Sequence, residues 1–204
     1  TRPAPTKNRM TDATNNNHNI VINQKIPGRA RPSDDALRAI KFLLLDVDGV
    51  LTDGRVHFDF EGREYKSFHV HDAAGIVYWH RSGGQSGFLS GRGSEIVRRR
   101  AKELGVHDII LGRVDKAAAF SELLKRQDLK PEQVAYLGDD LLDLPVLRQV
   151  GFAATVPEAR KEVLAAAQFV SERSAGFGAA RDVIEELLRA RGVWQKVVDQ
   201  DGRP

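Results

Sequence analysis

Reactive side chains occur in four short stretches of this sequence, each close behind an apolar run. The stretches are Asp46-Val47-Asp48-Gly49, Ser90-Gly91-Arg92, Asp115-Lys116 and Gly138-Asp139-Asp140. Open parallel sheets bind their ligands at the carboxyl ends of the strands. If the apolar runs are parallel strands, the acids, the hydroxyl and the lysine therefore converge on one edge of a sheet.

Asp46 and Asp48 are two residues apart, and two carboxylates at one strand end can hardly both stay ionised without a cation. All the candidate ligands are oxygens, which favours Mg²⁺ over zinc and is typical of sites that handle phosphate. One carboxylate can attack phosphorus while the other protonates the leaving oxygen and later activates water, and Asp46 and Asp48 fit these roles. Lys116, the Ser90 hydroxyl and loop amides can stabilise the transferring group.

Short apolar runs alternate with amphipathic stretches from Lys41 onward, as in a parallel sheet covered by helices. Strands are expected at 42–46, 87–90, 108–111, 134–138, 152–155 and 169–171. Helices are expected near 72–82, 94–104, 115–127, 143–149, 158–166 and 178–191. The pattern predicts a doubly wound, Rossmann-like α/β domain with helices on both faces of the sheet.

A hairpin is predicted from the alternating segments 55–60 and 63–70 around Glu61-Gly62, projecting after the first strand. The glycine-rich segment 83–87 is a poor start for a central strand. Residues 1–33 have few large apolar groups and are expected to form a disordered extension, with the domain at 34–191 and a C-terminal extension at 192–204.

Composition excludes several classes of function. The chain has 204 residues and no cysteine, which rules out a thiolate nucleophile or a cysteine-based zinc site. Its net charge of +3 comes from residues 1–41, with eight Lys/Arg against three Asp, while residues 42–204 carry 23 against 25 Asp/Glu. We therefore expect no nucleic-acid partner. Without an apolar run of membrane-spanning length, the protein is expected to be soluble and cytoplasmic.

The segments DVDGVLTDG (46–54), LSGR (89–92), DK (115–116) and GDDLLDLP (138–145) resemble the four motifs of the haloacid dehalogenase superfamily, in their usual order. The resemblance implies that Asp46 is the nucleophile and a metal ligand, and that Asp48 is the general acid/base and binds the metal through its carbonyl. It implies that Ser90 and Lys116 hold phosphate and that Asp139 is a further metal ligand. Asp140 or Asp143 would act through water or hydrogen bonds.

The spacing leaves no room for a cap domain either after the first motif or between Ser90 and Lys116. A capless enzyme must exclude water in another way, and the hairpin 55–70 can do so if a neighbouring subunit packs against it. The hairpin, FHVHDAAGI (68–76), GDDLLDLPVL (138–147) and SAGFGAARDVIEELL (174–188) resemble the 3-deoxy-D-manno-octulosonate 8-phosphate phosphatases. This resemblance implies a homotetramer that acts in lipopolysaccharide precursor synthesis.

Two segments depart from that family. This chain has His71-Asp72-Ala73 where the family usually has a basic residue followed by Asp-Gly. It has Ala175-Gly176-Phe177-Gly178 where the family usually has Gly-Gly-Arg-Gly. An arginine suits a carboxylate, so its loss leaves a nonulosonate 9-phosphate or another sugar phosphate open as substrate. The residues assigned to the substrate are Ser90, Gly91, Arg92, Lys116, His71 and Asp72. A receiver-like domain or a catalytically quiet regulatory subunit is the alternative of another class.

Overall fold

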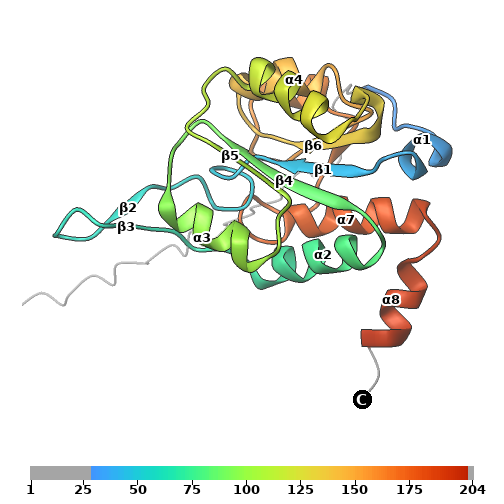
Figure 1. Ribbon diagram of the computed structural model, residues 1–204, viewed down its shortest axis with the longest axis horizontal. Helices are drawn as coiled ribbons and strands as arrows, with labels where there is room; N and C mark the ends of the chain where they lie inside the picture. The colour runs from blue at the N-terminus through green and yellow to red at the C-terminus, as the bar shows by residue number, and fades with distance from the viewer. Residues whose placement is uncertain (1–28, 202–204) are drawn as a thin grey trace, which may run out of the picture.

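The computed structural model describes residues 29–201, and its centre is a six-stranded parallel sheet in the order β5-β4-β1-β6-β7-β8 (Figure 1). The strands are β1 (Phe42–Leu45), β4 (Gln85–Ser90), β5 (Asp108–Leu111), β6 (Val134–Leu137), β7 (Phe152–Thr155) and β8 (Phe169–Val170). All of their pairings are parallel. The predicted doubly wound α/β fold is confirmed.

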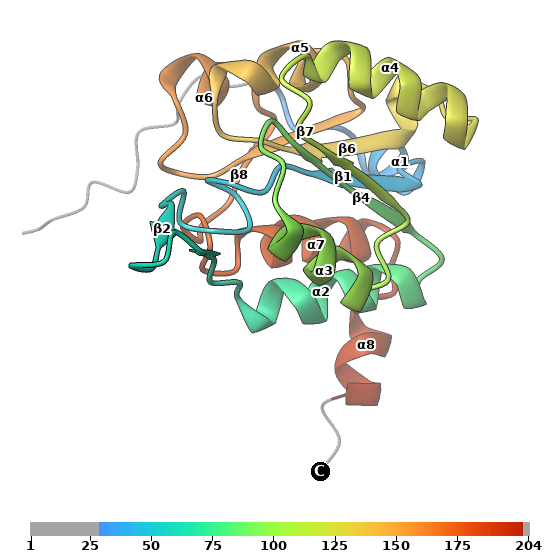
Figure 2. The same cartoon turned by 60° about the vertical axis from the view of Figure 1, so that its left-hand side comes forward.

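Helices cover both faces of the sheet. The helices are α1 (Asp34–Arg38), α2 (Val70–Arg81), α3 (Glu95–Glu103), α4 (Lys116–Gln127), α5 (Leu144–Leu147), α6 (Lys161–Ala166), α7 (Ala179–Ala190) and α8 (Trp194–Asp201), with short 3-10 turns η1 (Pro131–Gln133) and η2 (Leu141–Asp143). Figure 2 shows α2, α3 and α7 on one face and α4, α5 and α6 on the other. No helix within residues 29–201 is long and apolar enough to cross a membrane.

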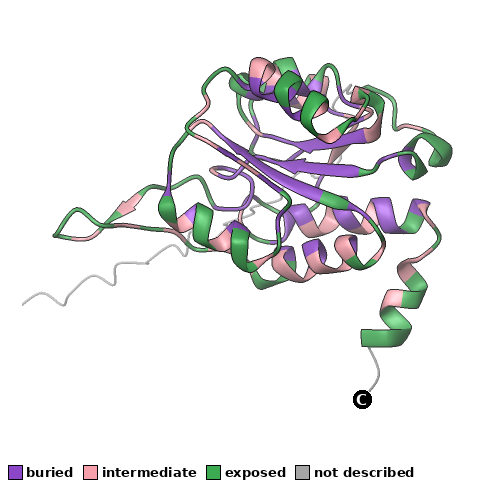
Figure 3. Cartoon of the chain, viewed as in Figure 1, coloured by how far each residue is buried: buried purple, intermediate pink, exposed green. Residues whose placement is uncertain are grey.

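Strand β1 lies between β4 and β6, and its four residues Phe42–Leu45 are fully buried. A strand covered by helices on both faces reads as a continuous apolar run, which is why this segment has no alternation. Figure 3 shows the same burial across the central strands. The chain passes from β1 to β4 on one side and later to β6 on the other, so the end of β1 lies at a topological switch point.

The predicted hairpin is present but shorter than expected. Its strands β2 (His57–Phe58) and β3 (Glu64–Tyr65) have two residues each, and Val70 opens α2 instead of ending a strand. A hairpin of two strands without a third is only marginally stable, so extra hydrogen bonds between its strands would add little stability. The turn is held by Asp59, whose carboxylate accepts from the amides of Glu61 and Arg63 at 2.9 Å each.

The ends of the described chain lie against the domain. The amide of Arg29 donates to the carbonyl of Ala167 at 3.1 Å, and Arg31 pairs with Glu186 at 2.6 Å. At the other end, Trp194 of α8 lies 5.1 Å from the guanidinium of Arg181. Residues 1–28, where most of the predicted disordered extension falls, lie outside the described residues.

Gly84 explains why a glycine-rich segment leads into a central strand. A Cβ atom at this position would lie 2.1 Å from the buried indole of Trp79, whose Nε1 donates to the carbonyl of Gln85 at 2.7 Å. The absence of a side chain lets the chain pass flat against the ring, and β4 begins at Gln85, two residues before the predicted start.

We expect Gly84→Ala to lower the free energy of unfolding by roughly 1–3 kcal/mol, because the added methyl group overpacks a rigid buried ring. Urea denaturation monitored by circular dichroism measures this change. Gly93→Ala is the matched control, since a Cβ there meets nothing within 4 Å. An equal effect of the two substitutions would contradict the role assigned to the Trp79 contact.

Candidate active site

Asp46 directly follows β1 and is almost completely buried, at 6% exposure. Its Oδ1 accepts a hydrogen bond from the amide of Val47 at 2.7 Å, and its Oδ2 lies 2.9 Å from Nζ of Lys116. Burial, and next the charge of Asp143, raise the pKa of Asp46 to about 7 although Lys116 opposes the shift. Two distant motifs of the sequence thus meet at one carboxylate.

Lys116 is the first residue of α4 and is 4% exposed. Besides Asp46, its Nζ donates to Oδ1 of Asp143 at 2.6 Å. Burial acts to lower the pKa of Lys116, but the charges of Asp46 and Asp143 outweigh burial and raise it. The side chain therefore stays a cation at neutral pH and can hold an anionic group beside Asp46.

Asp143 is completely buried and contacts more groups of the site than the sequence analysis predicted. Its carboxylate accepts from Lys116, from the Tyr136 hydroxyl at 2.5 Å, and from the amides of Asp139 and Asp140 at 2.9 and 3.0 Å. Those amides lie in the loop after β6, so Asp143 shapes this loop. Asp140 is exposed, with Oδ1 3.9 Å from Nε of Arg160.

Asp46, Asp139 and Asp143 each offer an oxygen within 4.8 Å of the others. Oδ1 of Asp139 is buried and has no hydrogen-bond partner among residues 29–201. Burial, and next the charge of Asp143, raise the pKa of Asp139 to about 7. Three carboxylates beside one lysine leave excess negative charge, and one of their buried oxygens has no hydrogen-bond partner within the described chain. These residues fit a hard divalent cation such as Mg²⁺.

Asp48 is two residues from Asp46, but it is not one of the three clustered acids, and its carboxylate has other partners. Its Oδ1 pairs with Nζ of Lys66, and Arg92 Nε is 3.9 Å from its Oδ2. The metal-ligand role predicted for Asp48 concerns its carbonyl and stays a prediction. Lys66 and Tyr136 were missed by sequence reasoning because neither belongs to a motif. Tyr136 gives one signal in the sequence: it places a polar hydroxyl in a run that is otherwise apolar and is predicted to be a buried strand.

Ser90 ends β4 next to β1 and is 2% exposed, and its Oγ accepts from the amide of Arg92 at 3.1 Å. Gly91 has open space around its Cα, with nothing within 4 Å of an added Cβ. The guanidinium of Arg92 donates to Glu64 of the hairpin at 3.1 Å. Arg92, one of the residues assigned to the substrate, therefore contacts the hairpin.

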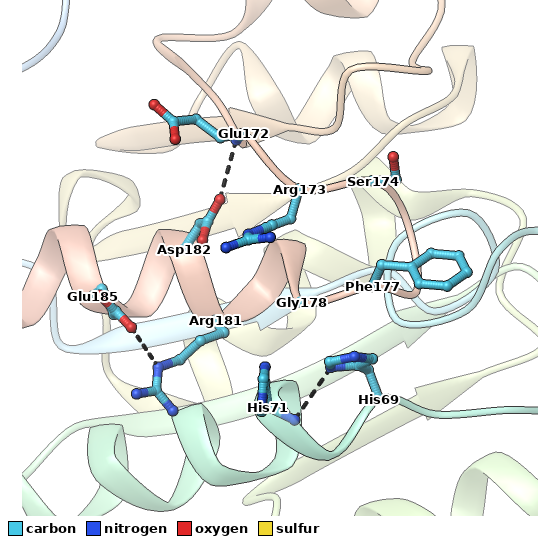
Figure 4. Close-up of a pocket in the computed structure, with 10 residues that line it drawn as sticks. All are labelled: His69, His71, Glu172, Arg173, Ser174, Phe177, Gly178, Arg181, Asp182 and Glu185. Atoms are coloured by element: carbon cyan, nitrogen blue, oxygen red, sulfur yellow. Dashed lines mark hydrogen bonds and ion pairs between the residues drawn. The ribbon is translucent and has the colours of Figure 1, made fainter. Parts of the chain in front are cut away.

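Asp72 and His71, both assigned to the substrate, have different surroundings. Asp72 is 3% exposed, and its carboxylate accepts from the amide of Arg181 at 2.9 Å, so it caps the start of α7. His71 lines a cavity of about 770 Å³ together with His69, Arg173 and Phe177 (Figure 4). No interaction links Asp72 to the Asp46 cluster among the described residues.

A second cavity, of about 320 Å³, is lined by Gly49 and Asp139 and also by Ser174 and Phe177. Phe177, which is 60% exposed, and Ser174 also line the cavity that contains His71. The two cavities therefore border each other at Ser174 and Phe177.

Residues 90–181 match the model of the haloacid dehalogenase-like hydrolases. The 3-deoxy-D-manno-octulosonate 8-phosphate phosphatase KdsC of Haemophilus influenzae is 42% identical over 156 residues, which are 76% of this chain and 87% of that protein. Its counterpart from Escherichia coli K12 is 39% identical over 153 residues, 75% and 81% of the two chains.

Solved structures agree with this relationship. The 3-deoxy-D-manno-octulosonate 8-phosphate phosphatase of Moraxella catarrhalis, crystallised with magnesium, phosphate and KDO, superposes with a TM-score of 0.80 at 36% identity, covering 81% of this chain and 95% of that one. The chain therefore belongs to the family of 3-deoxy-D-manno-octulosonate 8-phosphate phosphatases, within the haloacid dehalogenase-like hydrolases.

Proposed function

We propose that this protein is a Mg²⁺-dependent phosphatase that hydrolyses 3-deoxy-D-manno-octulosonate 8-phosphate through an aspartyl-phosphate intermediate on Asp46. The observation that carries the proposal is the buried Asp46 carboxylate, held 2.9 Å from Lys116 inside a cluster of acids. The substrate is supported by relatives of that activity at about 40% identity.

Each side chain has a defined part in this reaction. A carboxylate oxygen of Asp46 attacks phosphorus while the bond to the sugar oxygen breaks, and Asp48 gives its proton to that oxygen. Asp48 then takes a proton from the water that attacks the aspartyl phosphate, which releases phosphate and regenerates Asp46. Lys116 and Ser90 hold the phosphoryl oxygens through both steps.

Asp46, Asp139 and the carbonyl of Asp48 are the proposed ligands of Mg²⁺, and the position of the Asp143 carboxylate adds it to the candidates. When bound, the cation neutralises the crowded carboxylates and polarises the phosphoryl group toward attack. Asp143 also orients Lys116, since it receives a hydrogen bond of 2.6 Å from Nζ. Asp140 is exposed and would act from outside the cluster through water.

The departures at His71 and Phe177 keep a nonulosonate 9-phosphate as the alternative substrate. Phe177 lines the cavity that contains Asp139, and both residues line the neighbouring larger cavity. The receiver-like and catalytically quiet alternatives are less well supported. Lys116 lies 2.9 Å from Asp46 and 2.6 Å from Asp143, an arrangement that supports phosphate binding beside the proposed nucleophile.

We also propose a cytoplasmic homotetramer in lipopolysaccharide precursor synthesis, in which the hairpin covers a neighbouring subunit's site. Phe60 at the hairpin turn is 94% exposed, and Phe58 and Tyr65 are 59% and 52% exposed. Apolar side chains gathered on one projecting element are typical of a protein interface. Such packing would exclude water from a site that has no cap domain.

Asp46→Asn is expected to abolish phosphate release, because an amide cannot form the acyl phosphate. Phosphate release from a panel of sugar and ulosonic-acid phosphates with Mg²⁺ measures the effect and ranks the substrates. Thermal unfolding of the variant with Mg²⁺ controls for its fold. Equal turnover in the two proteins would contradict the nucleophile assignment.

We expect Mg²⁺ to raise the melting temperature more at pH 8 than at pH 5. The pKa values of Asp46 and Asp139 are raised to about 7, so without a cation the folded state binds more protons than the unfolded state between about pH 4 and 7. Stability then falls as pH rises through this window, and a bound cation removes the loss. Thermal unfolding with Mg²⁺ or EDTA measures both trends, and Asp139→Asn should weaken them. A metal-free protein that becomes more stable from pH 5 to pH 7 would count against this electrostatic account.

Light scattering should give the mass of a tetramer for the wild-type protein and a lower mass for Phe60→Asp, because the charge cannot be buried in a contact between subunits. Val114→Asp, at a residue 62% exposed outside the hairpin, is the control. A wild-type monomer would remove the basis of the proposal.

A further inference from the structure

Lys66 is unusual among the lysines because its side chain is 0% exposed although the residue belongs to a short surface hairpin. Its Nζ pairs with Oδ1 of Asp48 and lies 3.4 Å from Oε1 of Glu64. The hairpin therefore places a buried cation on the carboxylate that the proposed reaction uses as its acid and base.

Glu64 connects this pair to the segment between β4 and α3. Its Oε1 accepts from Arg92 at 3.1 Å, and its Oε2 accepts from the Ser94 hydroxyl at 2.8 Å. Arg92 and Ser94 belong to the segment between β4 and α3, so three separate parts of the chain meet at Asp48. This network fixes where the ammonium group of Lys66 lies.

The two oxygens of Asp48 are not equivalent. Oδ1 is occupied by Lys66, whereas Oδ2 is buried and has no hydrogen-bond partner among residues 29–201. The nearest cation to Oδ2 is Arg92, whose Nε at 3.9 Å is beyond hydrogen-bond distance. An oxygen without a hydrogen-bond partner can gain or lose a proton without breaking an existing hydrogen bond.

We propose that Lys66 is a positioning residue that holds Oδ1 of Asp48 and thereby leaves Oδ2 as the oxygen that exchanges the catalytic proton. This inference rests on the proposed function. In the first step, the Oδ2–H bond breaks and the proton goes to the sugar oxygen as its bond to phosphorus breaks. In the second step, Oδ2 receives a proton from the attacking water.

A purely structural ion pair would be the simpler explanation of this contact. Buried ion pairs, however, add little net stability, because desolvation offsets most of the attraction between the charges. They do fix the geometry of their members. A buried lysine held by Glu64 on one side and Asp48 on the other is therefore better explained by orientation of the acid than by stability of the hairpin.

The test compares Lys66→Met with the wild-type protein on two phosphate esters, using kcat/KM because this ratio covers the step in which the leaving group departs. p-Nitrophenolate leaves readily without a proton, whereas the alkoxide of a sugar phosphate needs one. Loss of Asp48 orientation should lower kcat/KM for the sugar phosphate by about ten- to a hundredfold and leave p-nitrophenyl phosphate nearly unchanged. An equal fall for the two esters, or no fall, would overturn the proposal.

Arg63→Met is the matched control, because it removes a cation of the same hairpin that pairs with Asp59 and Glu61 instead of Asp48. In an Asp48→Asn background, Lys66→Met should have no further effect on the sugar phosphate, and an additive loss would contradict action through Asp48. If Lys66→Met does not fold, Glu64→Gln tests the same network. It should also lower kcat/KM more for the sugar phosphate than for p-nitrophenyl phosphate, but by a smaller factor. A wild-type protein that releases no phosphate from either ester would instead refute the proposed function.

Discussion

Electrostatic crowding around Asp46 is the constraint on which the rest of this structure depends. Asp46, Asp139 and Asp143 lie within 4.8 Å of one another in a largely buried site, with Lys116 as the cation in contact with two of them. Such a cluster is unfavourable unless protons or a metal ion compensate the charge. The raised pKa values of Asp46 and Asp139 show the first form of compensation, and binding of Mg²⁺ is the second.

The fold brings these groups together through backbone packing as much as through side chains. The ends of β1 and β6 are neighbours in the sheet, and a Cβ at Gly49 would lie 2.3 Å from the carboxylate of Asp139. Gly49, with its positive φ of 91°, therefore lets the two loops approach each other. Asp143 completes the arrangement because it binds both the loop amides and Lys116.

The hairpin contributes to the site from the opposite side. Its two short strands have little stability of their own, but the buried Lys66 and the Glu64 network attach its base to Asp48 and to the start of α3. The same element carries Phe58 and Phe60 outward, where nothing within the described chain covers them. The hairpin thus contacts the Asp48 carboxylate through Lys66, while Phe58 and Phe60 are exposed.

The sequence by itself determined the fold class, the order of the strands along the chain and the four motifs, because buried parallel strands appear as apolar runs and motif residues follow them directly. The sequence predicted the ends of helices and strands less accurately where contacts between residues distant in sequence decide them. The hairpin is shorter than predicted because α2 begins at Val70. Strand β4 begins earlier than predicted because Gly84 lies against Trp79.

Only the tertiary structure decided what each polar side chain contacts. The sequence gives no distance between Lys66 and Asp48, between Tyr136 and Asp143, or between Asp72 and the start of α7. These contacts join segments that meet only after the sheet and its helices have packed. The physical reason is that hydrogen bonds and ion pairs depend on positions within a few tenths of an ångström, whereas hydrophobic patterning specifies only which face of an element is buried.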